Sequence, residues 1–191
     1  MRVLVACEYS GTVRDAFTAR GHHAVSCDLL PSERPGPHLQ QDVREVLGQG
    51  WDLMVAHPPC THLALSGARW FHRKQKEQAE ALDFVRALLG APIPRIALEN
   101  PASIISTRVR PKDQVVHPYF FGEPFEKQTW LWLKGLPLLV PTNLVEPGPR
   151  AVFKSGKSMP AWYNLPPGPN RWKARSKTFQ GLADAMAAQW G

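Results

Sequence analysis

The feature that most constrains this chain is a short apolar run that stops abruptly at two prolines. Residues 51–56 read Trp-Asp-Leu-Met-Val-Ala, and His57, Pro58, Pro59 and Cys60 follow directly. Proline lacks the N–H that a sheet ladder needs, so a strand formed by this run must end at the prolines. In an open α/β sheet, the carboxyl ends of the strands border the ligand crevice. We therefore predict that Cys60 lies in such a crevice and acts as a nucleophile.

A second buried strand places an acid at the same edge of the sheet. Residues 95–98 are largely apolar and lead into Glu99, Asn100 and Pro101. Residues 75–90, between the two strands, form the clearest predicted helix, with an apolar stripe on one face. Successive strands joined in this way are parallel neighbours whose carboxyl ends meet at one edge. The sequence therefore predicts that Cys60 and Glu99 share one crevice.

The beginning of the chain has the layout of a nucleoside-binding α/β unit. An apolar strand, a turn at residues 8–11 (Glu-Tyr-Ser-Gly), a helix capped by Ser10 or Thr12, and a second strand lead to Asp28. An acid at this point accepts hydrogen bonds from ribose hydroxyls, although it is also able simply to cap the strand end. The turn has a single glycine, which gives poor support to a pyrophosphate, so the pattern favours a nucleoside without phosphates.

Asp42 is a second acid near the same predicted crevice. It is placed either to accept a hydrogen bond from the exocyclic amine of a purine or to cap the short helix that follows it.

Together these patterns predict one α/β domain, residues 1–191, with a mostly parallel sheet and helices on both faces. Residues 134–170 contain eight prolines and no strong periodicity. This composition indicates an irregular segment, which would be either an ordered clamp or a flexible lid. Residues 171–191 regain helical spacing and are expected to pack back onto the sheet.

The composition favours a polyanionic partner in a reducing compartment. Lys and Arg outnumber Asp and Glu by 23 to 16, which gives a formal net charge of +7; when joined to a site, such a charge favours nucleic acid. The three cysteines lack paired spacing and the opening run is too short for a signal peptide, so we expect a cytoplasmic protein. No apolar run approaches the ~20 residues needed to span a bilayer, and no membrane partner is expected.

Two basic stretches are the candidate contacts to nucleic-acid phosphates. Residues 61–74 carry Arg69, Arg73 and Lys74 beside two aromatic residues, which suits phosphate contact and base stacking in a mobile loop. The second stretch lies in the C-terminal tail and consists of Arg171, Lys173, Arg175 and Lys177. The alternative for both stretches is ordinary solvated charge, at a helix start in the first.

Over most of residues 2–133, the order of motifs resembles that of the DNA cytosine-5 methyltransferases. That family ends its nucleophile strand in Pro-Cys, matched by Pro59-Cys60, and continues with Ser-x-Ser-Gly, similar to Ala-Leu-Ser-Gly at 64–67. Its later Glu-Asn-Val is similar to Glu99-Asn100-Pro101.

The later motifs of the family are matched more loosely. Gly122-x-Pro124 resembles the start of the family's Gly-x-Pro-Gln-x-Arg-x-Arg segment, which places Lys127 and Thr129 at its two arginines. Thr61 stands where the family has Gln, and its large target-recognition domain is missing. Segment 134–170 is the candidate for its replacement, unless a dimer or a partner protein supplies recognition.

The resemblance implies a Rossmann-like fold that uses S-adenosylmethionine to methylate carbon 5 of cytosine in double- or single-stranded DNA, through a covalent cysteine adduct. Cys60 would add to carbon 6, while Glu99, held by Asn100, would bind the ring with a pKa raised by burial, and Lys127 would supply a cation near the base carbonyl. The residues implied for the cofactor are Glu8, Tyr9, Ser10, Gly11, Asp28, Asp42 and Pro58. Those implied for DNA are Ser66, Arg69, Arg73, Lys74, Arg171, Lys173, Arg175 and Lys177.

Three other functions remain open from the sequence. His57, Cys60 and His62 lie within six residues and would form part of a metal site if another cysteine approached, although zinc motifs normally have a second paired cluster. An enzyme acting on free pyrimidine nucleotides would keep the same fold. A non-catalytic nucleic-acid-binding module would also keep it, but such a module needs neither Cys60 nor Glu99.

Overall fold

A seven-stranded sheet forms the centre of the protein, in the order β3-β2-β1-β4-β5-β7-β6. The structure, a computed structural model, describes residues 1–164, 166–168 and 171–191. The first five strands of this order are parallel, and β7 runs antiparallel to both β5 and β6. The predicted α/β fold with a mostly parallel sheet is therefore confirmed. The strands are β1 (Arg2–Ala6), β2 (His23–Asp28), β3 (His38–Gln40), β4 (Leu53–Ala56), β5 (Arg95–Asn100), β6 (Gln114–Val116) and β7 (Thr129–Lys134).

The central strands are apolar on both faces because helices cover both faces. In β1, Val3 and Val5 belong to one buried cluster, whereas Leu4 and Ala6 belong to the other. This is the period-2 alternation of a strand, and a parallel sheet covered on both sides requires apolar residues at every position. The continuous runs in the sequence are the consequence.

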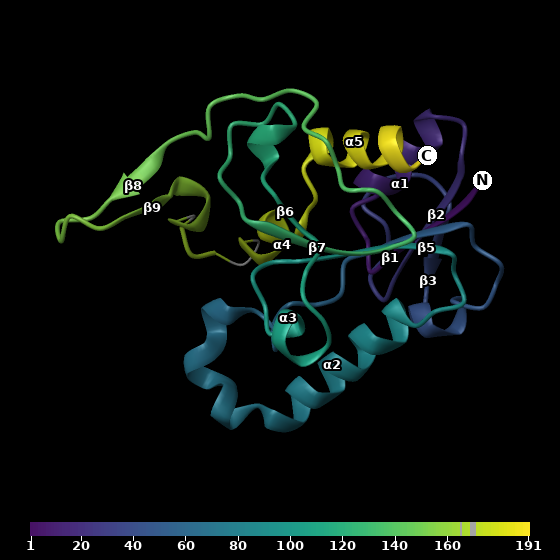
Figure 1. Ribbon diagram of the computed structural model, residues 1–191, viewed down its shortest axis with the longest axis horizontal. Coiled ribbons are helices and arrows are strands. Elements are labelled where there is room, and N and C mark those ends of the chain that lie inside the picture. Colours follow the sequence, from purple (N-terminus) through teal and green to yellow (C-terminus); the bar gives the residue numbers. More distant parts are fainter. Residues whose placement is uncertain (165, 169–170) are drawn as a thin grey trace.

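Two pairs of helices cover the sheet. Helices α1 (Thr12–Ala19) and α5 (Gln180–Trp190) lie on one face, and α2 (Gln75–Leu89) and α3 (Ile105–Arg108) lie on the other (Figure 1). None of the described helices combines the length and apolar composition that crossing a bilayer requires. The shorter helices are η1 (Val43–Glu45), η2 (Leu65–Arg73), η3 (Pro118–Phe120), η4 (Ala161–Asn164) and α4 (Arg171–Ser176).

Residues 61–74, expected to form a loop, contain the 3-10 helix η2. The chain is held there by its neighbours: Leu63 is fully buried, and its carbonyl accepts the N–H of Ile104 at 3.0 Å. The N–H of Leu65 donates to the carbonyl of Ala102 at 2.9 Å. These bonds tie the start of η2 to the segment that follows β5.

Segment 134–170, expected to be irregular, contains an antiparallel hairpin of β8 (Arg150–Val152) and β9 (Ser158–Pro160). The hairpin projects away from the sheet, at the far left of Figure 1. The stretch before it is anchored on α5, because the Gln189 amide pairs with the Val140 backbone at 2.8 Å in both directions. Positions 165, 169 and 170 of the segment lie outside the described residues.

Candidate active site

A cavity of about 550 Å³ lies at the carboxyl ends of the central parallel strands. It sits where the strand order changes direction between β1 and β4, which is the usual ligand position in an open α/β sheet. Its volume falls within the range of about 300–1,000 Å³ typical of small-molecule sites. The strand ends contribute Cys7 and Glu8 after β1, Asp28 at the end of β2, His57 to Cys60 after β4, and Glu99 and Asn100 at the end of β5.

The loop that carries Cys60 is fixed from both sides. Asn100 is buried, and its side-chain amide donates to the Pro58 carbonyl at 2.9 Å. The Cys60 carbonyl accepts the N–H groups of Leu63 and Ala64 at 3.0 and 2.9 Å, which forms a turn immediately after the cysteine. Cys60 itself is exposed and lines the cavity. The predicted crevice therefore holds both Cys60 and Glu99.

His57 pairs with Glu99 inside the cavity. Its Nδ1 lies 3.1 Å from Glu99 Oε2, and the two side chains are 8% and 15% exposed. Desolvation raises the pKa of Glu99, but the His57 hydrogen bond and the nearby Lys127 charge outweigh it, so the net pKa is lowered. The expectation that burial would raise the pKa of Glu99 is wrong, because the fold supplies these two compensating groups. Glu99 is ionised at neutral pH and accepts the Nδ1–H of His57.

Lys127 approaches the same cavity from the loop before β7. Its ammonium donates to the Arg175 carbonyl at 3.2 Å and lies 5.6 Å from the ring centres of Trp162 and Phe179. Desolvation lowers the pKa of Lys127, Glu99 and Cys60 oppose that shift, and Arg175 adds to it. The Lys127 ammonium therefore lies near enough to the Glu99 carboxylate for the two charges to shift each other's pKa.

The walls of the cavity remove water from the Cys60 thiol even though the residue is exposed at the mouth. This desolvation raises the pKa of the thiol, and the Glu99 carboxylate raises it further. Lys127 and Arg175 oppose the shift without cancelling it. A proton acceptor must therefore act when Cys60 becomes a nucleophile.

Glu8 occupies the N-terminus of α1 at the other end of the cavity. It is buried, and its carboxylate accepts the N–H groups of Val13 at 2.7 Å and Arg14 at 3.2 Å. The N-cap residue is Gly11 rather than the expected Ser10 or Thr12, although the Ser10 hydroxyl accepts the N–H of Thr12 at 3.3 Å. A helix N-terminus commonly binds phosphate. Here a carboxylate already fills that position, which suits a nucleoside ligand without phosphates.

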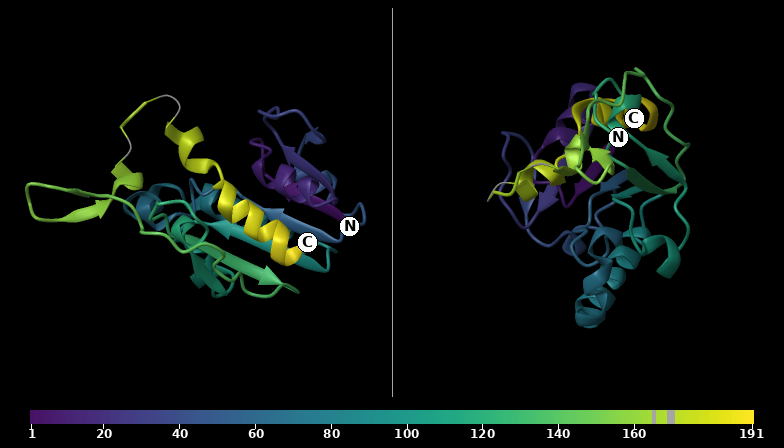
Figure 2. Two further views of the ribbon diagram at one scale, coloured as in Figure 1. Left: turned by 90° about the horizontal axis from the view of Figure 1, so that it is seen from above. Right: turned by 90° about the vertical axis from the view of Figure 1, so that its left-hand side faces the viewer.

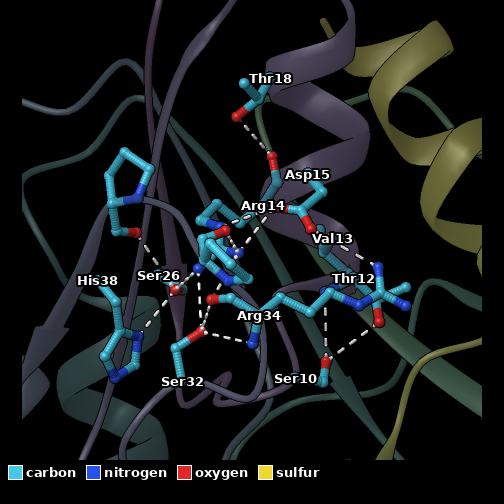
Figure 3. Close-up of polar contacts among 12 residues, drawn as sticks. Ser10, Thr12, Val13, Arg14, Asp15, Thr18, Ser26, Ser32, Arg34 and His38 are labelled. Atoms are coloured by element: carbon cyan, nitrogen blue, oxygen red, sulfur yellow. Dashed lines mark hydrogen bonds and ion pairs between the residues drawn. The ribbon is translucent and has the colours of Figure 1, made fainter.

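A buried arginine fixes the loop that borders this end of the cavity (Figure 3). Arg14 is fully buried, and its guanidinium donates to the Ser26 and Ser32 hydroxyls at 3.2 and 3.1 Å and to the Pro35 carbonyl at 2.9 Å. It also forms an ion pair with Asp15 at 2.8 Å. These bonds attach the loop after β2 to helix α1.

The two acids predicted for the cofactor have different surroundings. Asp28 lines the cavity, and its Oδ1 accepts the N–H of Leu30 at 2.9 Å. Asp42 caps η1 by accepting the N–H of Arg44 at 2.9 Å and forms an ion pair with the same residue. Neither Asp42 nor Gly11 lines the cavity, although Asp42 is close enough to raise the pKa of the Cys7 thiol. Of the seven cofactor candidates, the cavity brings together Glu8, Tyr9, Ser10, Asp28 and Pro58.

The predicted DNA contacts fall into three groups. Ser66, Arg175 and Lys177 line the cavity, with Lys177 paired to Glu33 at 2.5 Å. Arg69 and Arg73 are exposed on η2 and stack on Trp70 at 5.1 and 5.4 Å, and Lys74 follows them. In α4, Arg171 donates to the Tyr163 carbonyl at 3.2 Å, and the Lys173 carbonyl accepts the Ser176 hydroxyl at 3.0 Å.

Several lining residues were not found from the sequence. Gln128, Trp162, Tyr163 and Thr178 line the cavity, and the Tyr163 hydroxyl accepts the Gln128 N–H at 3.0 Å. The position of His57 between a buried strand and two prolines was a usable signal for a site residue, but the sequence did not reveal its pairing with Glu99. Thr61 also lines the cavity, whereas Thr129 is buried at the start of β7. Within the described ranges, no three His, Cys, Asp or Glu side chains gather as a metal site.

The arrangement defines an α/β protein with a Rossmann-like fold and an acid- and thiol-lined cavity at the carboxyl edge of its sheet. No protein-family model matches the chain, and no curated protein matches it. Among solved structures, it is similar to an Escherichia coli prophage protein described as a "putative DNA modification methyltransferase", with a TM-score of 0.50 and 13% identity. The match covers 76% of this chain and 52% of that one, so the chain spans about half the length of its structural relative. At this identity the likeness shows a shared fold.

Proposed function

We propose that the protein transfers a methyl group from S-adenosylmethionine to carbon 5 of cytosine in DNA, through a covalent adduct with Cys60. One observation carries the proposal: Cys60, Glu99 and Lys127 come from three separate elements and line a single cavity whose other end holds Glu8 and Asp28. A cavity with these two ends would suit a reacting base beside a nucleoside. The fold shared with a protein described as a DNA modification methyltransferase agrees with this class.

The cofactor end suits S-adenosylmethionine because that molecule is a nucleoside without phosphates. Asp28 would accept hydrogen bonds from the ribose hydroxyls, and Tyr9, Ser10 and Pro58 would form the wall around it. The carboxylate of Glu8 occupies the helix N-terminus and would repel a diphosphate there. When bound, S-adenosylmethionine supplies an electrophilic methyl group.

The reacting end supplies a nucleophile and a route for one proton. Carbon 5 of cytosine is a weak nucleophile until the sulfur of Cys60 bonds to carbon 6, which moves the electrons of the double bond toward carbon 5. As the C–S bond forms, the thiol proton leaves and the ring nitrogen gains one. Glu99 is ionised and close enough to raise the pKa of the thiol, so it is placed to take the first proton and deliver the second. Carbon 5 would then bond the methyl group as the bond between that group and the cofactor sulfur breaks, which leaves a neutral thioether. Loss of the carbon 5 proton to water and breakage of the C–S bond would release Cys60 as a thiolate, which regains its proton when Glu99 takes the one on the ring nitrogen and returns it.

His57 and Lys127 would stabilise the charges of this step, on Glu99 and on the cytosine ring respectively. His57 donates to Glu99 and keeps it ionised, so that it is able to receive a proton. Lys127 would face the base carbonyl and stabilise negative charge that develops on the ring. Because a base in a duplex is stacked and paired, it must be flipped out to reach this cavity, at a cost of a few kcal/mol.

The test is incubation with labelled S-adenosylmethionine and duplex DNA, single-stranded DNA or dCMP, followed by mass spectrometry of the nucleosides. We expect 5-methylcytosine from DNA. We also expect Cys60→Ala to abolish transfer while calorimetry shows unchanged cofactor affinity. Turnover by Cys60→Ala would remove the nucleophile assignment. Label in dCMP but never in DNA would instead favour an enzyme of free pyrimidine nucleotides.

A further inference from the structure

The β8–β9 hairpin is an ordered ribbon that the cavity chemistry does not use. Its strands pair from Arg150 opposite Pro160 to Val152 opposite Ser158. The turn is closed by backbone hydrogen bonds, from the Phe153 N–H to the Lys157 carbonyl and from the Gly156 N–H to the Phe153 carbonyl, both 2.9 Å. Figure 1 and the left view of Figure 2 show the ribbon extending clear of the sheet.

The tip of this ribbon combines positive charge with exposed apolar groups. Residues 150–160 contain three basic residues and no acidic residue. Lys154 and Lys157 are both exposed, and Val152 and Phe153 are 74% and 41% exposed. Adjacent exposed apolar side chains beside lysines are costly to leave in water and are typical of a surface that contacts a partner. The charge selects an anionic partner.

The base of the hairpin is joined to the cavity wall. Strand β9 runs directly into η4, whose Trp162 and Tyr163 line the cavity. Arg150, at the start of β8, forms an ion pair with Glu126, the neighbour of Lys127 in the chain. A molecule that enters the cavity and extends beyond it is therefore able to contact the hairpin as well.

We propose that the β8–β9 hairpin enters the major groove of duplex DNA beside the base that is held in the cavity. The major groove is about 12 Å wide and accepts a two-stranded ribbon. Lys154 and Lys157 contact phosphates, and Val152 and Phe153 lie against base edges, where thymine methyl groups offer an apolar partner. This inference rests on the proposed function and specifies duplex DNA as the form that the protein recognises.

Helix η2 supports the same partner from the same side of the molecule. Figure 1 shows η2 and the hairpin both extending beyond the left end of the sheet. On η2, Arg69 and Arg73 are exposed around Trp70, which is itself 43% exposed. Positive groups on two separate arms suit a long polyanion better than a single small nucleotide.

The test measures binding of fluorescent duplex and single-stranded oligonucleotides by two double variants, Val152→Ser/Phe153→Ser and Lys154→Gln/Lys157→Gln. The matched controls are Val140→Ser, which is 65% exposed, and Lys76→Gln on α2. All these side chains are exposed, and circular dichroism should show the wild-type fold for every variant. We expect each hairpin variant to weaken duplex binding about 10-fold or more, and the controls to bind normally. The lysine variant should also reduce the salt slope of log K by about two, whereas the apolar variant should leave the slope unchanged.

Two further assays distinguish a loss of major-groove contact from a loss of methyl transfer. Dimethyl sulfate footprinting should show protection of guanine N7, a major-groove atom, that disappears in both hairpin variants. Transfer to a short single-stranded oligonucleotide should be unchanged in the variants. Unaltered duplex binding and footprints, or an equal loss for single and double strands, would overturn the groove assignment. If wild-type protein methylates nothing but the hairpin variants still lose duplex binding, the proposed function fails and the hairpin inference stands.

Discussion

Replacing His57 by alanine tests the site through one well-defined contact. The change removes the Nδ1 donor that lies 3.1 Å from Glu99 Oε2. A hydrogen bond to a charged group contributes about 1.5–3 kcal/mol. If the reacting complex depends on it in full, kcat/KM falls by about 10- to 160-fold, at 1.36 kcal/mol for each factor of ten.

The same variant should change the pH dependence in a defined direction. The pKa of Glu99 is lowered because the His57 bond and the Lys127 charge outweigh desolvation. Without His57 the pKa of Glu99 rises, so the carboxyl stays protonated to higher pH and the acid limb of the kcat/KM profile moves to higher pH. A carboxyl with a lowered folded-state pKa stabilises the protein above its unfolded pKa, and this stability is lost as pH falls through the folded pKa. His57→Ala should therefore lose stability at neutral pH and depend less on pH in the acid range.

The assay is methyl incorporation from labelled cofactor into DNA, measured from acid to neutral pH. His57→Asn places an amide donor near the position of Nδ1 and should recover much of the rate. His72→Ala, in an exposed part of η2, is the control and should match wild type. A His57→Ala enzyme with normal kcat/KM and an unshifted acid limb would refute the role assigned to the pair.

Three further predictions concern other parts of the molecule. Arg14→Met should cost about 1–3 kcal/mol in urea unfolding, because it removes the hydrogen bonds of a fully buried guanidinium to Ser26, Ser32 and Pro35. Arg44→Met at an exposed pair should cost less than about 1 kcal/mol, and similar losses for the two variants would contradict the structural role of Arg14. Asp28→Ala should weaken cofactor binding in calorimetry and spare DNA binding, and an unchanged cofactor affinity would remove Asp28 from the site. Gly181→Ala should destabilise the protein by about 1–3 kcal/mol or more, because the added Cβ would lie 2.0 Å from the Phe121 carbonyl oxygen; Gly48→Ala, which has open space, should change the melting temperature little.

The parts of the site that follow strands were accessible to sequence reasoning. Cys60 and Glu99 end apolar runs, and parallel pairing brings such ends to one edge, so their common cavity follows from the pattern. The pairing of Glu99 with His57 could not be predicted in the same way. The apolar sequence around Glu99 indicates that its carboxyl is buried but does not indicate its partner. Which neighbour compensates that burial depends on side-chain placement. For this reason the direction of the Glu99 pKa shift was predicted wrongly.

The cavity residues that follow segment 134–160 could not be predicted from the sequence, for a different reason. Proline-rich composition indicates the absence of regular helices, but it does not reveal that a chain is held by side-chain amides such as that of Gln189. Nor does it place Trp162 beside Lys127, since the 34 residues between them include a hairpin of only two short strands. Glu8 is a third case, because a turn sequence does not show which of its polar groups will cap the following helix.

Because β7 runs in the reverse direction, residues inserted before it and after it would lie at opposite edges, or rims, of the sheet. The two rims should therefore differ in how well they tolerate insertions. Because β7 is antiparallel to β5, its first residues meet the end of β5, with Trp130 opposite Asn100, and its last residue, Lys134, lies opposite Ile96 near the start of β5. Extra residues inserted before β7 would enter the cavity wall at Lys127 and Gln128. Extra residues inserted directly after β7 would leave from the opposite rim, away from Cys60 and Glu99. Variation in chain length that preserves the chemistry should therefore accumulate directly behind Lys134.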